Sequence, residues 1–256
     1  AVMEQYGKFR PDFVINFQWI PGSQDYSYID GFTSLIIHNS KSKRSETITI
    51  EDLNRELGSS LRWFSGFSWL NALEFTVNNG RIYFRYDYIK KSGATILTVP
   101  ENIEFENEVF QEKALALAYT KDNNLYVFQN NTESAITSFK DENIVSGQAI
   151  ARSEFGITNG IFWSPNGNFL AFYQKDETDV SSYPLLDITK TPGFTNFIKY
   201  PMAGQKSEKP KVGIYNMATK STAYIEPRGA KDDYLTNLAW SKDEKHVLIA
   251  EVKRNQ

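Results

Sequence analysis

The sequence predicts an all-β protein of the β-propeller class. Three features favour this class: a strand–turn–strand signature that recurs along the chain, aromatic anchors at regular spacing, and little helical periodicity. The anchors are separated by 50, 50, 44 and 77 residues and are Trp19, Trp69, Tyr119, Trp163 and Trp240. Periods of about 40–50 residues built from short strands are typical of propeller blades. We therefore expect a partial propeller of about four to five antiparallel blades.

The clearest copy of the signature spans residues 162–172. An apolar strand ending in Trp163 meets a Ser-Pro-Asn-Gly turn, and a second strand begins at Phe169. Pro165 presets φ at the first corner of that turn, and Gly167 adopts a positive φ without steric cost. This combination predicts a β-hairpin.

The other elements follow from the same kind of pattern. Looser copies of the hairpin fall at 17–28 and 68–77, and clearer ones at 116–128 and 238–250. Further strands, rich in β-branched and aromatic residues, are expected at 81–88, 94–99, 134–139, 212–216 and 221–225. Only residues 50–57 (IEDLNREL) have helical character, with Glu51 and Asp52 as charges of the first helical turn.

The 77-residue gap between the last two anchors is one blade period plus an insertion of roughly 30 residues. We place the insertion at 175–211. Long excursions from a β scaffold usually bind something or cover an edge. The alternative is an extended hairpin that packs on its own blade.

Composition excludes several classes of function. The formal net charge is −3, so there is no basic footprint and we expect no nucleic-acid partner. The sequence holds no run of about 20 apolar residues that would span a membrane. It has no cysteine, which excludes a disulfide scaffold and cysteine-based metal sites. We expect no metal and no cofactor.

Catalytic equipment is also missing from the 256 residues. The two histidines, His38 and His246, are interpreted as residues at strand ends, and the pair Asp232-Asp233 as solvated surface. The sequence has no Gly-x-Ser-x-Gly segment to present a nucleophilic serine. We expect this polypeptide alone to have no hydrolytic activity.

The ends of the sequence suggest a longer protein. The chain begins without methionine, and its last hairpin reaches residues 253–256 with no strand left to complete a blade. Propellers protect their edge strands by closing a ring of blades. We therefore expect residues 1–256 to be part of a longer chain.

The segment from Gly147 to Asp187 resembles the propeller of dipeptidyl peptidase IV-type serine exopeptidases. Further matches, in the same order, are 200–204 (YPMAG), 212–215 (VGIY), 235–241 (LTNLAWS) and 250–256 (AEVKRNQ). The resemblance is strong from about Lys113 onwards. It implies an N-terminal propeller, commonly eight-bladed, and a C-terminal α/β-hydrolase domain that carries the Ser-Asp-His triad and is absent here.

The resemblance also implies a role for Glu154. In this family, acidic residues of the propeller hold the free α-amino group of the substrate, because a partly desolvated ammonium needs a charged partner. Dipeptidyl peptidases of the family carry adjacent glutamates here, whereas this chain has Arg152, Ser153 and then Glu154. This is closer to the bacterial prolyl tripeptidyl aminopeptidases. We expect Arg152 to orient Glu154 or to pair with it, and the alternative for Glu154 is a solvated acid in a loop or at a helix end.

The function expected from the resemblance is substrate selection in a proline-specific serine exopeptidase that releases dipeptides or tripeptides. Its partners would be peptides with a free N-terminus, its own hydrolase domain and, through the 175–211 insertion, a second subunit of a homodimer. The expected location is the bacterial periplasm or cell surface. Two alternatives stay open: a non-catalytic propeller that acts as a binding or scaffold protein, and a family member whose hydrolase domain has lost its triad.

Overall fold

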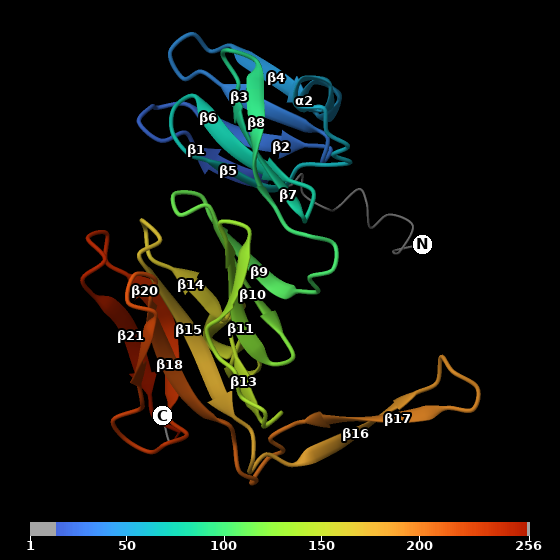
Figure 1. Cartoon of the computed structure of the whole chain (residues 1–256), viewed down its shortest axis with the longest axis vertical. Helices are drawn as coiled ribbons and strands as arrows, with labels where there is room; N and C mark the ends of the chain where they lie inside the picture. Colours follow the sequence, from blue (N-terminus) through green and yellow to red (C-terminus); the bar gives the residue numbers. More distant parts are fainter. Residues whose placement is uncertain (1–13, 255–256) are drawn as a thin grey trace, which may run out of the picture. The chain divides into compact units, whose positions relative to one another are not determined.

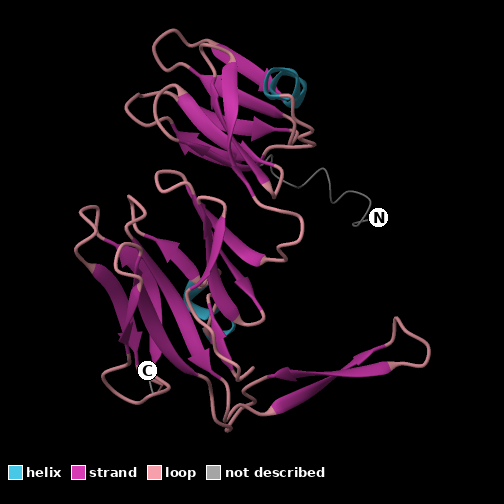
Figure 2. Ribbon diagram, in the orientation of Figure 1, coloured by secondary structure: helices cyan, strands magenta, loops and turns pink. Residues whose placement is uncertain are grey.

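The computed structural model describes residues 14–254, and nearly all its regular structure is β-strand (Figures 1 and 2). The pairings between described strands are antiparallel, which confirms the predicted fold class. The chain divides into two compact units, Ala1–Glu101 and Asn102–Gln256. Each unit is described by itself. Among residues 14–254, no helix is long and apolar enough to cross a membrane.

The first unit contains two four-stranded sheets, each with its strands paired in chain order. The first consists of β1 (Ile15–Trp19), β2 (Tyr26–Asp30), β3 (Ser34–His38) and β4 (Ser45–Thr49). The second consists of β5 (Ser65–Trp69), β6 (Glu74–Asn78), β7 (Ile82–Asp87) and β8 (Ser92–Thr98). One apolar core joins the two sheets. The buried indole N–H of Trp69 donates across it to Ser27 Oγ at 2.7 Å.

The helix α2 (Ile50–Leu57) has the bounds that the sequence predicts. Thr49 caps it: its Oγ1 accepts from the backbone N–H of Asp52 at 3.2 Å, and the Asp52 carboxylate accepts from the backbone N–H of Thr49 at 3.3 Å. This reciprocal pair satisfies N–H groups that the helix cannot bond itself. Gly58, at a φ of 61°, ends the helix in the left-handed conformation.

The second unit begins with a four-stranded sheet. Its strands are β9 (Glu106–Gln111), β10 (Ala116–Lys121), β11 (Asn124–Gln129) and β12 (Thr132–Ala135). Two expectations need correction here. Tyr119 lies in the second strand of its sheet, whereas the tryptophan anchors other than Trp163 end the first strand of theirs. The strand expected at 134–139 ends at Ala135, because the Thr137 side chain accepts from the N–H of Leu125 at 2.9 Å and replaces the strand ladder.

The next sheet surrounds β15 (Phe169–Asp176), which pairs with β18 (Lys209–Asn216), and β18 pairs with β19 (Ser221–Ile225). The other edge of β15 is shared by two short strands, β13 (Ile144–Ser146) and β14 (Ile161–Trp163). A further sheet is formed by β20 (Tyr234–Trp240) and β21 (Val247–Val252). Two apolar cores lie among these strands.

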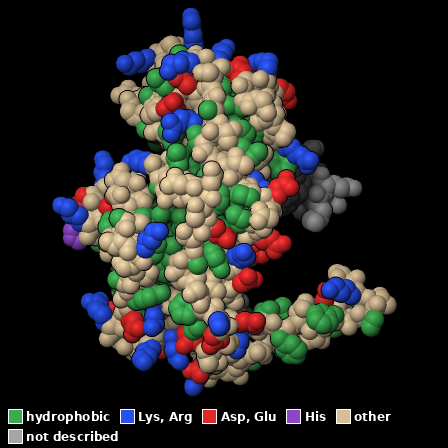
Figure 3. Space-filling view, viewed as in Figure 1, with side chains coloured by type: hydrophobic (Ala, Val, Ile, Leu, Met, Phe, Trp, Pro, Cys, Tyr) green, Lys and Arg blue, Asp and Glu red, His purple; other side chains and the backbone are tan. Residues whose placement is uncertain are grey.

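Between β15 and β18, the strands β16 (Ser182–Asp187) and β17 (Phe194–Lys199) pair only with each other. We call this hairpin the arm. Figure 1 shows it extending away from the other strands of its unit. Large apolar side chains are exposed along it, as Figure 3 shows.

Tryptophan indoles connect neighbouring sheets of the second unit. Trp163 Nε1 donates to the carbonyl of Val109 at 3.0 Å, and Trp240 Nε1 donates to the carbonyl of Phe162 at 3.0 Å. Trp163 ends β14 and reaches back to β9, the first strand of the preceding sheet. Trp240 ends β20, the first strand of its own sheet, and reaches back to β14. The anchors therefore contribute specific hydrogen bonds as well as spacing.

Candidate functional site

A loop interrupts the edge of the β15 sheet. The N–H of Gly147 donates to the carbonyl of Tyr173 at 2.8 Å, and the N–H of Tyr173 donates to the carbonyl of Gly160 at 2.9 Å. The chain therefore leaves the sheet after β13 and returns to it before β14. Both points lie opposite Tyr173 of β15. Residues 148–159 form a loop whose two ends are held together by Tyr173.

The base of this loop requires glycine at both ends. A Cβ on Gly160 would lie 2.3 Å from the carbonyl carbon of Gln148, which is far inside contact distance. Gly147 has a φ of 80°, and a Cβ there would lie 2.7 Å from the Thr120 side chain. A left-handed backbone and a close approach are the two conditions under which only glycine fits easily.

Glu154 lies on the 3-10 helix Ala151–Gly156 inside this loop. Ile150 and Ile157, which flank the helix, are buried in an apolar core and fix its ends. Phe155 packs edge-on against the Tyr234 ring, with centroids 5.0 Å apart. The helix is thus anchored on both sides while Glu154 is exposed.

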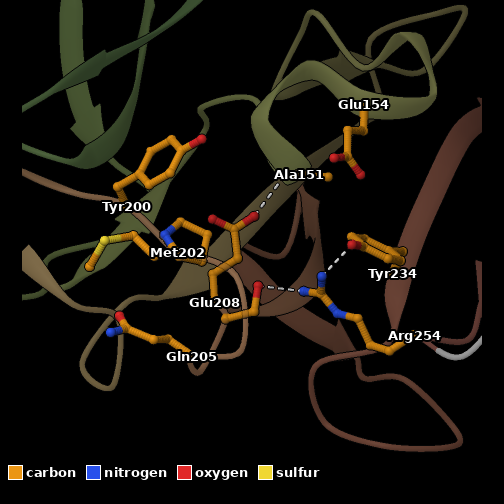
Figure 4. Close-up of a pocket in the computed structure, with 10 residues that line it drawn as sticks. Ala151, Glu154, Tyr200, Met202, Gln205, Glu208, Tyr234 and Arg254 are labelled. Atoms are coloured by element: carbon orange, nitrogen blue, oxygen red, sulfur yellow. Dashed lines mark hydrogen bonds between the residues drawn. The ribbon is translucent and has the colours of Figure 1, made fainter. Parts of the chain in front are cut away.

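Glu154 lines a pocket of about 260 Å³. Its walls come from three parts of the second unit: the 3-10 helix, the segment that follows the arm, and the final strands. The lining residues are Ala151, Glu154, Tyr200, Pro201, Met202, Gln205, Ser207, Glu208, Tyr234 and Arg254. Figure 4 shows Glu154 and Glu208 pointing into this space from different segments.

Arg254 builds one wall of the pocket. Its guanidinium stacks over the Tyr234 ring, with the central carbon 3.8 Å from the centroid, and donates to the Tyr234 hydroxyl. It also donates to Ser207 Oγ at 2.5 Å and to the carbonyl of Asp232 at 2.6 Å. With these donors in use, Arg254 holds the segment after the arm against the last strands.

Glu208 is the second acid of the pocket, and it is deeply buried. Its Oε1 accepts a hydrogen bond from the backbone N–H of Ala151 at 2.7 Å, and its Oε2 lies 3.8 Å from Lys175 Nζ. Lys175 also pairs with Glu177 at 2.8 Å. Glu208 therefore has partners for both oxygens.

Glu154 differs from Glu208 in this respect. Among the residues that the structure describes, no side chain donates a hydrogen bond to the Glu154 carboxylate or forms an ion pair with it. Arg152, the partner expected from the sequence, lies in the same 3-10 helix, but its side chain falls outside the described part of the chain. An exposed carboxylate without a described partner, on an anchored helix, is available to bind a cationic group.

The remaining sequence candidates lie elsewhere or have structural roles. The ring of His38 stacks on Tyr26 in the first unit, with centroids 4.9 Å apart. Asp233, expected to be solvated, is buried: its carboxylate accepts from the N–H of Ala230 at 2.9 Å and from the N–H of Arg254 at 3.2 Å. The two backbone N–H groups satisfy the buried Asp233 carboxylate, so the expectation of a solvated Asp233 is wrong.

In residues 14–254 no group of three or more histidine or acidic residues could hold a metal ion.

Sequence reasoning missed Glu208, Tyr234 and Arg254 as pocket residues. Each comes from a different segment, and Glu208 lies 54 positions beyond Glu154. Two of the three lie in stretches that the sequence analysis names for other reasons: Glu208 in the 175–211 insertion and Arg254 in the 250–256 run of the resemblance.

Comparison with known proteins gives a consistent result. A family model described as the dipeptidyl peptidase IV (DPP IV) N-terminal region matches residues 81–256. A curated relative, dipeptidyl aminopeptidase B of Saccharomyces cerevisiae, is 25% identical over 233 residues, which cover 83% of this chain and 27% of the relative.

Two solved structures have the same fold. A "putative dipeptidyl aminopeptidase IV" from Bacteroides ovatus has a TM-score of 0.78 and 33% identity, covering 96% of this chain and 34% of that one. Porphyromonas gingivalis dipeptidyl peptidase 4 has a TM-score of 0.73 and 19% identity, covering 99% of this chain and 38% of that one, and shows the fold alone. The chain thus spans about a quarter to two fifths of the length of these three proteins.

Proposed function

Because the chain belongs to the family of the dipeptidyl peptidase IV N-terminal region, we propose that it selects substrates for a proline-specific serine exopeptidase. In this proposal, the pocket lined by Glu154 receives the free N-terminus of a peptide. The observation that carries it is the exposed Glu154 carboxylate, which has no described partner and is held on an anchored helix in a pocket of about 260 Å³.

The chemistry of the pocket supports binding of an ammonium group. An α-ammonium that leaves water needs charge-assisted hydrogen bonds, and a fixed carboxylate provides them. The tyrosine rings of Tyr200 and Tyr234 line the same pocket and offer apolar surface to the first side chain of the peptide. A carboxylate at a set distance from a nucleophile in the hydrolase domain would then determine how many residues are removed.

We propose that the acidic residue in the helix sets the length of the released product. Where dipeptidyl peptidases of the family have adjacent glutamates, this chain has Ser153 and Glu154. We propose release of dipeptides or tripeptides that end in proline. Rates on Xaa-Pro and Xaa-Xaa-Pro chromogenic peptides distinguish the two products directly.

The experiment for this proposal uses Glu154→Gln in the full-length protein. This change keeps the shape of the side chain and removes its charge. We expect kcat/KM on a free-amine peptide to fall roughly 30- to 1000-fold, which corresponds to about 2–4 kcal/mol. A peptide substrate with an acetylated amino group serves as the control, because it has no ammonium to hold and its rate should not change. Equal rates for variant and wild type on the free amine would refute the role of Glu154.

The arm supports a proposal about assembly. Leu186 and Phe197 are both 69% exposed, on strands that pair only with each other. Apolar side chains gathered on a projecting hairpin are typical of an interface. We propose that the arm contacts a second copy of the protein in a homodimer.

The proposed location, periplasm or cell surface, follows from the family resemblance and is tested by cell fractionation.

A further inference from the structure

We propose that Glu208 is a positioning residue that sets the place of the Glu154 carboxylate. The proposal rests on the function proposed above. Glu208 immediately precedes β18 and is only 5% exposed. A buried carboxylate is strongly destabilising unless its charge has partners. The partners of Glu208 therefore indicate its role.

The first partner is the backbone N–H of Ala151, 2.7 Å from Glu208 Oε1. Ala151 is the first residue of the 3-10 helix that carries Glu154. The first N–H groups of a helix have no acceptor within it and are usually capped by the side chain of the preceding residue. That residue is Ile150, which makes no side-chain cap hydrogen bond. Glu208 provides the missing cap from a distant part of the chain.

The backbone of Ala151 makes this hydrogen bond more important. Its φ is 53°, in the left-handed region that is sterically unfavourable for a residue with a Cβ. A residue in this conformation persists only when its surroundings hold it there. The Glu208 hydrogen bond is such a restraint at the start of the helix, so it fixes the direction in which Glu154 leaves the loop.

The second partner, Lys175, balances the charge of Glu208 and provides a matched control. Lys175 Nζ lies 2.8 Å from Glu177 Oε1 and 3.8 Å from Glu208 Oε2. Glu177 is similarly buried, at 8% exposure, and shares the same cation. It makes no described contact with Ala151. Removing its charge perturbs the same buried ion pair without removing the cap of the helix.

The test compares Glu208→Ala, Glu208→Gln and Glu177→Gln in the full-length protein. Glutamine keeps an oxygen that can accept from Ala151, whereas alanine does not. We expect Glu208→Ala alone to increase hydrogen–deuterium exchange in a peptide covering 148–157. On a free-amine peptide, Glu208→Ala should raise KM roughly tenfold with kcat nearly unchanged, and Glu208→Gln should restore KM to within about threefold of wild type.

Each outcome has a defined meaning. If Glu208→Ala leaves both exchange and KM at wild-type values, the positioning role is wrong. If Glu208→Gln is as damaging to KM as Glu208→Ala while exchange stays normal, the Glu208 charge contacts the substrate itself and the positioning role is again wrong. If Glu154→Gln leaves kcat/KM on the free-amine peptide unchanged, the proposed function fails separately, and exchange alone then decides whether Glu208 holds the helix.

Discussion

The carboxylate of Glu244 accepts a hydrogen bond from the backbone N–H of Asn166 at 2.5 Å. It also accepts from Asn168 Nδ2 at 2.7 Å. The turn after Trp240 is thereby tied to the Ser-Pro-Asn-Gly turn after Trp163. The two copies of the hairpin signature that the sequence reveals are thus bonded directly to each other through the most polar part of each.

This contact predicts a pH-dependent stability. Burial alone would raise the pKa of Glu244, but hydrogen bonds from Ser164, Asn166 and Asn168 lower it to about 2, from an ordinary value of 4.5. A lowered folded-state pKa stabilises the protein above pH 4.5, and the contribution is lost as pH falls toward 2. We expect the difference in unfolding free energy between wild type and Glu244→Gln to shrink over this range in urea titrations. A difference that is constant with pH would contradict the assignment.

The glycine at the base of the loop gives a second prediction. In Gly160→Ala the new Cβ would meet the Gln148 backbone, so the loop must open at its base. We expect a loss of about 1–3 kcal/mol in unfolding free energy and weaker peptide binding. Gly193→Ala, where a Cβ would meet nothing closer than 3.5 Å, is the control and should be nearly neutral. Similar melting temperatures for the two variants would show that the loop base tolerates the methyl group.

The tryptophan indoles that donate hydrogen bonds from one sheet to the next give a third prediction. Trp240→Phe removes the donor to the carbonyl of Phe162 and part of a packed ring, for which we expect a loss of about 1–3 kcal/mol by chemical denaturation. Trp63→Phe alters an indole that is 53% exposed and should change stability by no more than about 0.5 kcal/mol. If both substitutions cost the same, the hydrogen bond between sheets contributes nothing measurable.

The arm is tested by Leu186→Ser combined with Phe197→Ser in the full-length protein. We expect the mass from light scattering to shift from dimer to monomer with little change in melting temperature, because both side chains are exposed on the hairpin. Ile89→Ser, at a side chain 58% exposed in the first unit, should leave the mass unchanged. A dimer that survives the double substitution would place the interface elsewhere.

The 256-residue chain by itself should not react with a serine-directed phosphonate, because its sequence has no nucleophile motif. The full-length protein should be labelled under the same conditions. The measurement is the intact mass after incubation. A covalent adduct on the short chain would reveal a nucleophilic residue that sequence analysis overlooked.

Local sequence predicted the hairpins and the helix well. The Ser-Pro-Asn-Gly turn and the helix Ile50–Leu57 depend on neighbouring residues, so their information lies within a few positions. The pocket could not be predicted in this way. Glu208 meets Ala151 only after the arm has left and returned to its sheet, and the burial of Asp233 depends on Arg254 across the last hairpin. Contacts between distant segments leave no local pattern.

The direction of the indole hydrogen bonds has a consequence for synthesis on the ribosome. In the three pairs, the donors Trp69, Trp163 and Trp240 come later in the chain than their acceptors. Each acceptor has therefore already been translated when its tryptophan emerges. Domains generally fold as units during translation, the N-terminal one first. The order of these hydrogen bonds is therefore compatible with sheets that pack in the order in which they are synthesised, each against a sheet that already exists.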